Sequence, residues 1–235
     1  DLANLDAEGE EGRTVLHNAA EFSDASFVSR LVKQGADIHR RNHLGTTPVD
    51  LAIRNGRIKV AEAMVDMPII QWVIEKGRYS EIEWLIGLGA VIDEKNADGL
   101  NVLQMAVQDG NFYLVKRFSC LGANFTVIDR EGLGLFHLAA ENGQEFMFPA
   151  LKEMGADINA QDHSGDTPLH FAATYDKSKA LRVLKELGAQ LEIKNAIQMT
   201  ALHFATMEGC HEATRVLLEI GADSEAEDVN GATPL

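Results

Sequence analysis

Residues 162–188 read DHSGDTPLHFAATYDKSKALRVLKELG, and this stretch decides the fold. Thr167 followed by Pro168 predicts a helix start, because a threonine hydroxyl accepts an unpaired backbone N–H and proline at the first helical position lacks one. Apolar residues recur at helical spacing in two short segments, the second of which stops at Gly188. The stretch therefore predicts a turn and two short helices, a unit too small to bury its own apolar faces.

Copies of this unit run along the chain. A Gly-Ala pair marks the end of each copy, and its glycine stands at positions 35, 89, 122, 155, 188 and 221. The last four steps between these glycines are each 33 residues. A fixed period in this range is typical of a solenoid, in which stacked repeats bury a continuous core.

The repeated motifs resemble the ankyrin repeat over almost the whole chain. The matching segments are TPLHFAA at 167–173, TALHFA at 200–205 and GADINA at 155–160. The resemblance implies an all-α solenoid of stacked helix-turn-helix units with projecting β-hairpin-like turns. We expect one array over residues 1–235, with repeats at about 9–41, 42–67, 68–95, 96–128, 129–161, 162–194 and 195–227, and partial repeats at 1–8 and 228–235.

One step in the series is shorter than two periods. It spans 54 residues, so 12 residues are absent relative to 66, and the alignment places the gap at Met67/Pro68. We expect repeats two and three to stack with a near-direct connection between helices and without the turn that normally projects there. The deletion is either harmless, or it changes the local curvature or leaves a notch for a partner.

Pro149 lies inside the predicted second helix of repeat five. Proline removes one helical hydrogen bond and clashes with the preceding turn, so this helix should start late or kink.

Composition excludes several classes of partner. The net charge of −15 disfavours nucleic acid and anionic membranes as direct partners, and it would attract a basic segment. No apolar run reaches the roughly 20 residues of a membrane helix. Cys120 and Cys210 occupy different places in distant repeats, so we expect free thiols and a reducing, cytoplasmic setting. Both ends cut through repeats, which favours a fragment of a larger intracellular protein.

Histidines recur at one position of the repeat, where a metal site or general base is one interpretation. Their period is that of the fold, so each belongs to a different repeat, and the resemblance implies that they bond to turn backbone. We expect no catalytic residue, no metal site and no cofactor, because no set of different residue types converges. The histidines are His17, His137, His170 and His203, and Asp50, Gln71 and Gln104 take the same position in other repeats.

The resemblance also implies a concave groove that binds a protein or peptide, lined by turn tips and by the first helix of each repeat. Carried onto this chain, the groove spans repeats two and four to seven. Its residues are Arg41, His43, Leu44, Arg54 and Asn55 in repeat two, Ala97, Asp98, Leu100, Gln108 and Asp109 in repeat four, Arg130, Glu131, Leu133, Glu141 and Asn142 in repeat five, His163, Ser164, Asp166, Thr174 and Tyr175 in repeat six, and Ala196, Ile197, Met199, Met207 and Glu208 in repeat seven. In repeats six and seven, Tyr175, Ile197, Met199 and Met207 predict an apolar patch rimmed by Asp166 and Glu208. Clustered exposed apolar groups are typical of interaction sites, so this patch is our hypothesis for anchoring an apolar residue next to a basic one. The alternative is that Ile197 and Met199 pack locally beneath the next turn.

Asn159 matches the site at which asparaginyl hydroxylase modifies ankyrin turns, so the resemblance implies a hydroxylation site there. For the whole segment, two functions stay open. One is a scaffold that binds a partner segment in the groove. The other is a spacer or regulatory module attached to a catalytic, channel or signalling domain.

Overall fold

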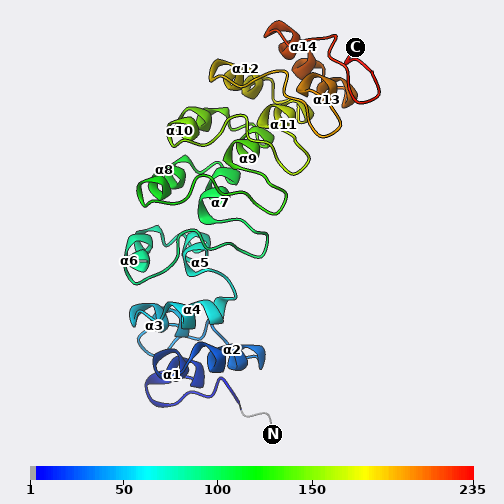
Figure 1. Ribbon diagram of the computed structural model, residues 1–235. Coiled ribbons are helices and arrows are strands. Elements are labelled where there is room, and N and C mark those ends of the chain that lie inside the picture. The colour runs from blue at the N-terminus through cyan, green and yellow to red at the C-terminus, as the bar shows by residue number, and fades with distance from the viewer. Residues whose placement is uncertain (1–3) are drawn as a thin grey trace. The chain divides into compact units, whose positions relative to one another are not determined.

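The computed structural model describes residues 4–235, and every regular element within them is helical. The described residues form two compact units, 4–97 and 98–235, and Figure 1 labels their helices. Unit 1 contains η1 (Glu10–Gly12), α1 (Val15–Phe22), α2 (Ala25–Lys33), α3 (Pro48–Arg54), α4 (Ile58–Val65), α5 (Ile69–Glu75), η2 (Tyr79–Glu81) and α6 (Ile82–Gly87). Unit 2 contains α7 (Val102–Gln108), α8 (Phe112–Cys120), α9 (Leu135–Glu141), η3 (Glu145–Met147), α10 (Phe148–Glu153), α11 (Pro168–Thr174), α12 (Ser178–Glu186), α13 (Ala201–Met207) and α14 (His211–Glu219).

The helices begin and end as the motif residues predict. Thr167 is the N-cap of α11, and Pro168 is its first residue. The same pair at Thr47 and Pro48 opens α3, where the Thr47 hydroxyl accepts the backbone N–H of Asp50 over 3.2 Å. Just after α12, Gly188 has a φ of +100°, a left-handed conformation that favours glycine.

First helices stack on first helices in most of each unit. In unit 1, α1 packs against α3 and α2 against α4, and in unit 2 the row runs α7, α9, α11 and α13. A buried alanine at one position of the repeat keeps neighbouring first helices close, because its side chain adds little bulk. These alanines are Ala19, Ala52, Ala106, Ala139, Ala172 and Ala205, each at most 2% exposed.

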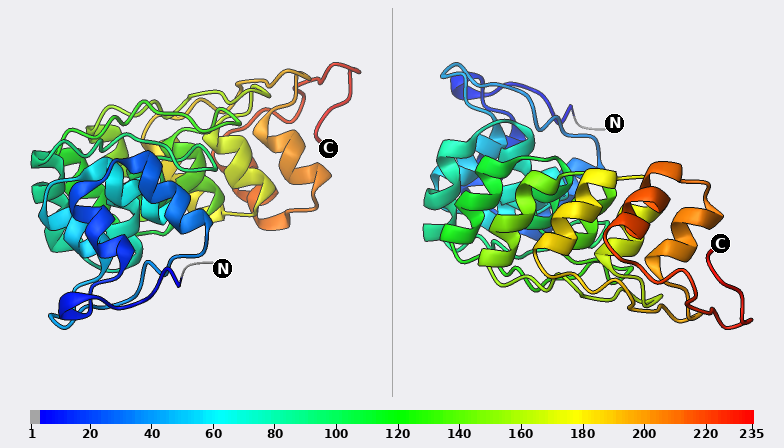
Figure 2. Two further views of the ribbon diagram at one scale, coloured as in Figure 1. Left: turned by 90° about the horizontal axis from the view of Figure 1, so that it is seen from below. Right: turned by 90° about the horizontal axis from the view of Figure 1, so that it is seen from above.

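The turns between repeats are joined by backbone hydrogen bonds. In unit 2 the turns line up along one side of the helices (Figure 2). The N–H of His163 donates to the carbonyl of Glu131 over 3.1 Å, and the N–H of Ala196 donates to the carbonyl of Ser164 over 2.9 Å. In unit 1 the N–H of His43 makes the equivalent bond to the carbonyl of Glu11, at 2.8 Å. These links and the helix stacking together hold the projecting turns in place.

The deletion between repeats two and three has the predicted local effect. α4 ends at Val65 and α5 begins at Ile69, so only Asp66, Met67 and Pro68 connect them. Asp66 takes a left-handed conformation with φ of +54°, which reverses the chain within this short link. The inter-repeat turn is absent here, as the sequence predicts.

The helix packing after this link was not predicted. α5, a first helix, packs against α4, a second helix (Figure 1). The second helix of this repeat, α6, lies beside the first helix α3. Before α6, Arg78 forms an ion pair with Asp50 near the start of α3. After α6, the Leu88 side chain lies next to Gly56, which follows α3. The missing turn therefore exchanges the two helix rows within unit 1.

Pro149 has the effect that its position predicts. The second helix of repeat five begins with the 3-10 turn η3 and becomes the α-helix α10 only at Phe148, so Pro149 is the second residue of the α-helix. In that position its missing N–H has no helical partner to lose.

Candidate functional site

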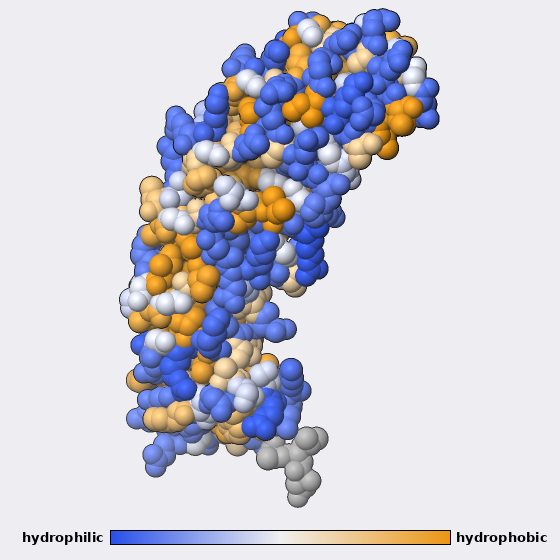
Figure 3. Space-filling model, viewed as in Figure 1, coloured by the Kyte–Doolittle hydropathy of each residue, from blue (hydrophilic) through white to orange (hydrophobic). Residues whose placement is uncertain are grey.

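A groove on unit 2 is lined by first helices and by the turns beside them. It has a volume of about 440 Å³ and draws residues from α7, α9 and α11. We call it the acidic groove, and it is lined by Asp98, Leu100, Gln108, Asp129, Arg130, Glu131, Leu133, Leu138, Glu141, Phe171 and Tyr175. In the space-filling view hydrophilic residues cover most of the visible surface, with hydrophobic residues in groups between them (Figure 3).

Negative charge dominates the rim of the acidic groove. Four carboxylates and one guanidinium line it, which leaves a formal charge of −3. The Asp129 carboxylate is partly engaged, since its Oδ1 accepts the backbone N–H groups of Glu131 and Leu133 over 2.9 and 2.8 Å. Glu131 is exposed, and Glu141 is half-buried. The groove therefore favours a cation.

Apolar side chains form the floor of the acidic groove. Leu133 and Leu138 are almost fully buried, whereas Phe171 is half-buried and Tyr175 is 47% exposed. Partial burial is the main cause that raises the pKa of the Tyr175 phenol, and the neighbouring Glu141 carboxylate raises it further. The hydroxyl is therefore protonated at neutral pH, and it is available as a hydrogen-bond donor beside Glu141.

The repeated histidines are structural. The Nδ1 atom of His170 accepts the backbone N–H of Thr167 over 3.1 Å, and its Nε2 donates to the carbonyl of Met199 over 3.0 Å. This pattern requires the neutral tautomer with hydrogen on Nε2. Burial lowers the pKa of His170 and of His137, which favours the same neutral form.

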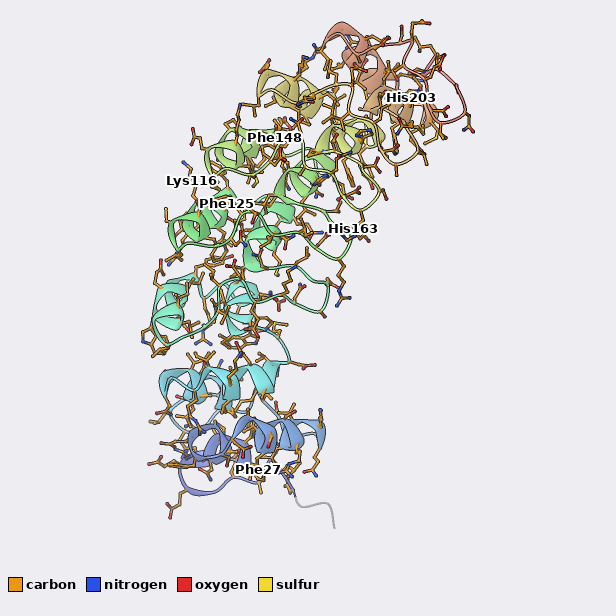
Figure 4. All side chains as sticks on the ribbon, viewed as in Figure 1. Phe27, Lys116, Phe125, Phe148, His163 and His203 are labelled. Carbon is orange, nitrogen blue, oxygen red and sulfur yellow. The ribbon has the colours of Figure 1, made fainter. Side chains whose placement is uncertain are left out.

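The other histidines at this position make equivalent bonds. Each joins the start of its helix to the carbonyl 29 residues later: His17 to Thr46, His137 to Asp166 and His203 to Ala232. Figure 4 shows His203 at a helix start, Phe148 among the helices and His163 on a projecting turn. The histidines therefore bind backbone in separate repeats and do not converge on a common point.

Gln104 replaces histidine without changing this arrangement. Its Oε1 accepts the N–H of Asn101 over 3.1 Å, and its Nε2 donates to the carbonyl of Leu133 over 3.3 Å. An amide thus supplies the same acceptor and the same donor as neutral imidazole.

No cluster of three or more His, Cys, Asp or Glu side chains has an arrangement that could hold a metal ion within residues 4–235. None of the helices in these residues has the length and hydrophobicity needed to cross a bilayer. Cys120 and Cys210 are both free thiols.

Comparison with known families agrees with the repeat geometry. The family model described as "Ankyrin repeats (3 copies)" matches residues 2–71, 69–162, 103–195 and 136–228. The chain belongs to the ankyrin repeat family. The acidic groove lies on the inner helices and turns of this ankyrin array, and ankyrin repeats are a protein-binding fold.

Several curated proteins are similar to parts of this ankyrin array. Protein phosphatase 1 regulatory subunit 27 of Mus musculus is 32% identical over 96 residues, 41% of this chain and 49% of that protein. Ankyrin repeat domain-containing protein 63 of Homo sapiens is 28% identical over 123 residues, 44% of this chain and 32% of that protein. ADP-ribosylation factor GTPase-activating protein AGD4 of Arabidopsis thaliana is 30% identical over 85 residues, 36% of this chain and 11% of that protein. The matched segments span at most about half the length of these relatives.

Three residues of the apolar patch predicted in repeats six and seven are divided between two hollows. Tyr175 lines the acidic groove, whereas Met199 and Met207 line a separate hollow beside α13. Met199 is only 9% exposed, and its backbone is held by two hydrogen bonds, from its N–H to Oδ1 of Asn195 and from Nε2 of His170 to its carbonyl. The expectation that Met199 is exposed is therefore wrong, while Ile197 and Met207 are 50% and 60% exposed.

The two predicted rim residues also differ from each other. Asp166 is half-buried, and its Oδ1 accepts the Nδ2 of Asn195 over 2.8 Å, so it joins two turns. Burial raises the pKa of Asp166. Glu208 is exposed at the end of α13. Neither residue lines the acidic groove.

Eight residues that line the acidic groove are among the longer set that the resemblance implies, and three are not. Asp129, Leu138 and Phe171 line the groove although none was among the predicted groove residues. Phe171 stands four residues before Tyr175, a spacing that places both on one face of α11. This spacing could have identified Phe171 as a groove residue from the sequence.

Asn159 occupies a structural position in the turn that follows α10. Its Oδ1 accepts the N–H of Gln190 over 2.9 Å. Asp6 and Glu192 make the same bond to the N–H groups of Asp37 and Asp223, each 31 residues later. The Asn159 amide is therefore held between two repeats, and its hydroxylation stays a prediction.

Proposed function

We propose that this ankyrin array is a recognition module that binds a partner protein through the acidic groove. The observation that carries the proposal is the combination of an acidic rim and an apolar floor in one hollow of about 440 Å³. Hollows of about 300–1,000 Å³ are typical of ligand-binding sites. A segment with a basic residue next to an apolar one matches both parts of the groove.

The contacts suggest how such a segment would bind. A guanidinium or ammonium group would lie between Glu131 and Glu141, where charge-assisted hydrogen bonds are stronger than neutral ones. The neighbouring apolar side chain would cover Phe171 and the ring of Tyr175, which removes apolar surface from water. The phenol of Tyr175 closes one side of this arrangement.

Binding of a labelled Arg-Leu-Arg peptide, measured by fluorescence anisotropy, tests the proposal. We expect saturable binding to the wild-type chain and much weaker binding of the same peptide with citrulline in place of arginine. Glu131→Gln and Tyr175→Ala should each weaken binding about tenfold, within the range of one charge-assisted bond or one aromatic contact. Glu186→Gln, an exposed change on α12, is the charge-matched control. Equal losses in the Glu131 variant and the control would refute the groove as the site.

A regulatory module within a larger protein is the second candidate. The relative in Arabidopsis thaliana is named as a GTPase-activating protein, and this chain covers 11% of it. The mouse relative is named as a regulatory subunit. Failure of the isolated chain to bind any arginine-containing peptide saturably would favour this second function.

We propose an intracellular location for the array; the two free thiols support it, because free thiols are typical of reducing compartments. We propose no catalytic role, because the repeated histidines are occupied by backbone.

A further inference from the structure

The absent turn leaves a recess in unit 1, which we call the junction notch. Ile38, Arg41, Asp50, Trp72, Lys76 and Arg78 are among its lining residues, and its volume is about 320 Å³. This size lies at the low end of the range for ligand sites of about 300–1,000 Å³. It fits one or two side chains rather than a folded element.

Arg78 at the floor of the notch is fully engaged by two carboxylates. Arg78 donates to Asp50 over 2.6 Å and forms a two-pronged pair with Glu81, at 2.8 and 2.9 Å. Its guanidinium also lies 5.1 Å from the centroid of the Trp72 ring. Arg78 is thus fixed in place and has little capacity left for a ligand.

Two further cations, Arg41 and Lys76, line the notch without forming an ion pair to any described residue. Arg41 donates to the carbonyl of Gly45, a neutral group, over 2.5 Å. Among residues 4–235, neither Arg41 nor Lys76 is within ion-pair distance of a carboxylate, and both are exposed. Charges are screened beyond about 8 Å at physiological ionic strength, so distant carboxylates of the chain act only weakly on these two cations.

The flank of the turn before α3 is also open. Other turns donate an N–H to the carbonyl at the position of Leu44, as Ala196 does to Ser164. The next turn is deleted, and within the described chain the Leu44 carbonyl accepts no such backbone bond. Leu44 is accordingly 79% exposed. An extended segment beside the notch could therefore add an N–H to this carbonyl.

We propose that the junction notch binds an acidic segment of a partner protein in place of the missing turn. A glutamate or aspartate carboxylate lies between the guanidinium of Arg41 and the ammonium of Lys76. An adjacent apolar residue packs beside Ile38, which is half-buried. The site is opposite in charge to the acidic groove, so it recognises a different class of sequence.

The probe is a labelled peptide with a Glu-Leu-Glu centre, titrated with the full chain at low salt and followed by anisotropy. We expect saturable binding that weakens as salt is added. Arg41→Gln and Lys76→Gln should each weaken it about tenfold, as expected for loss of one charge-assisted hydrogen bond. Arg41→Lys, which keeps the charge, should retain most of the affinity.

Two controls separate the notch from general electrostatics. Lys185→Gln makes the same change in net charge at an exposed site on α12 and should leave binding unchanged. The Gln-Leu-Gln peptide should not bind. Equal loss in Lys185→Gln, equal binding of the amide peptide, or no saturable binding by the wild-type chain would overturn the proposal. Self-association of the wild-type chain that Arg41→Gln abolishes, seen by light scattering, would instead identify a second copy as the occupant and would also overturn it.

Discussion

Arg78 donates a hydrogen bond from Nη1 to Oδ1 of Asp50 over 2.6 Å, and this bond joins repeats two and three where no turn lies between them. At the position of Asp50, other repeats have His or Gln, whose N–H donates to a turn carbonyl. The deletion removes that carbonyl and brings a donor, Arg78, to the same place. An acidic residue suits this position because an ionised carboxylate only accepts hydrogen bonds, and Arg78 only donates them. Burial alone would raise the pKa of Asp50, but hydrogen bonds from Thr47 and Arg78 lower it.

Arg78→Met should destabilise unit 1 by about 1–3 kcal/mol, because it leaves Asp50 half-buried without its cation. Both tryptophans of the chain, Trp72 and Trp84, lie in unit 1, so tryptophan fluorescence during urea unfolding reports on this unit. Arg182→Met is the comparison, with its stability followed by circular dichroism. This substitution breaks an exposed ion pair with Glu219 and should lower the free energy of unfolding by less than about 1 kcal/mol. Similar losses in the two variants would contradict a structural role for the Asp50 pair.

Replacing His137 and His170 together with Gln should flatten the pH dependence of stability. Burial lowers the pKa of both imidazoles below 6.5, so the unfolded chain binds protons first as the pH falls. Their contribution to stability is present above pH 6.5 and declines below it. Urea unfolding at about pH 7.5 and about pH 5.5 should show a larger loss in the wild-type chain than in the double variant. His170→Ala should instead cost about 1–3 kcal/mol at both pH values, because it leaves buried backbone groups unpaired.

Two glycines with left-handed backbone should respond differently to alanine. Gly188 has open space where a Cβ would lie, so Gly188→Ala should cost only the backbone strain of about 1–2 kcal/mol. A Cβ on Gly165 would lie 2.9 Å from the backbone nitrogen of Ala196, so Gly165→Ala should cost about 1–3 kcal/mol more. Chemical denaturation followed by circular dichroism measures both, and equal costs would show that the turns separate freely.

Asn159→Ala should destabilise the array by about 1 kcal/mol, because the N–H of Gln190 loses its acceptor. Asn159→Asp should be close to neutral, since Asp6 fills the equivalent position. The predicted hydroxylation adds one oxygen atom, which mass spectrometry of the native protein would locate on a peptide containing Asn159. An unmodified peptide would contradict that prediction.

The repeat itself could be predicted from the sequence because its signals are local. Thr167 with Pro168 and the glycine that ends each repeat define helix limits through backbone chemistry alone. The missing turn and the late start at Pro149 follow from the same kind of evidence. The exchange of helix rows could not be predicted, because the position of the gap says nothing of which helix α5 packs against.

The candidate site was predicted in part for a similar reason. The resemblance marks turn and helix positions, and Glu131, Glu141 and Tyr175 follow from it. It does not say how deeply a side chain at such a position is buried. Met199 was therefore expected at the surface, although it is only 9% exposed. Phe171 was not among the predicted groove residues, although it is half-buried and lines the groove.

The three-residue link from α4 to α5 bears on how such proteins diversify. A chain that can lose a third of a repeat and still stack tolerates insertions and deletions that are not multiples of the period. The first and second helices of a repeat can then pack against each other's faces, as α5 packs against α4. The number of repeats in such a sequence and the order of its helix rows can therefore change independently. Each irregular junction can evolve a new binding surface while the other repeats keep their packing.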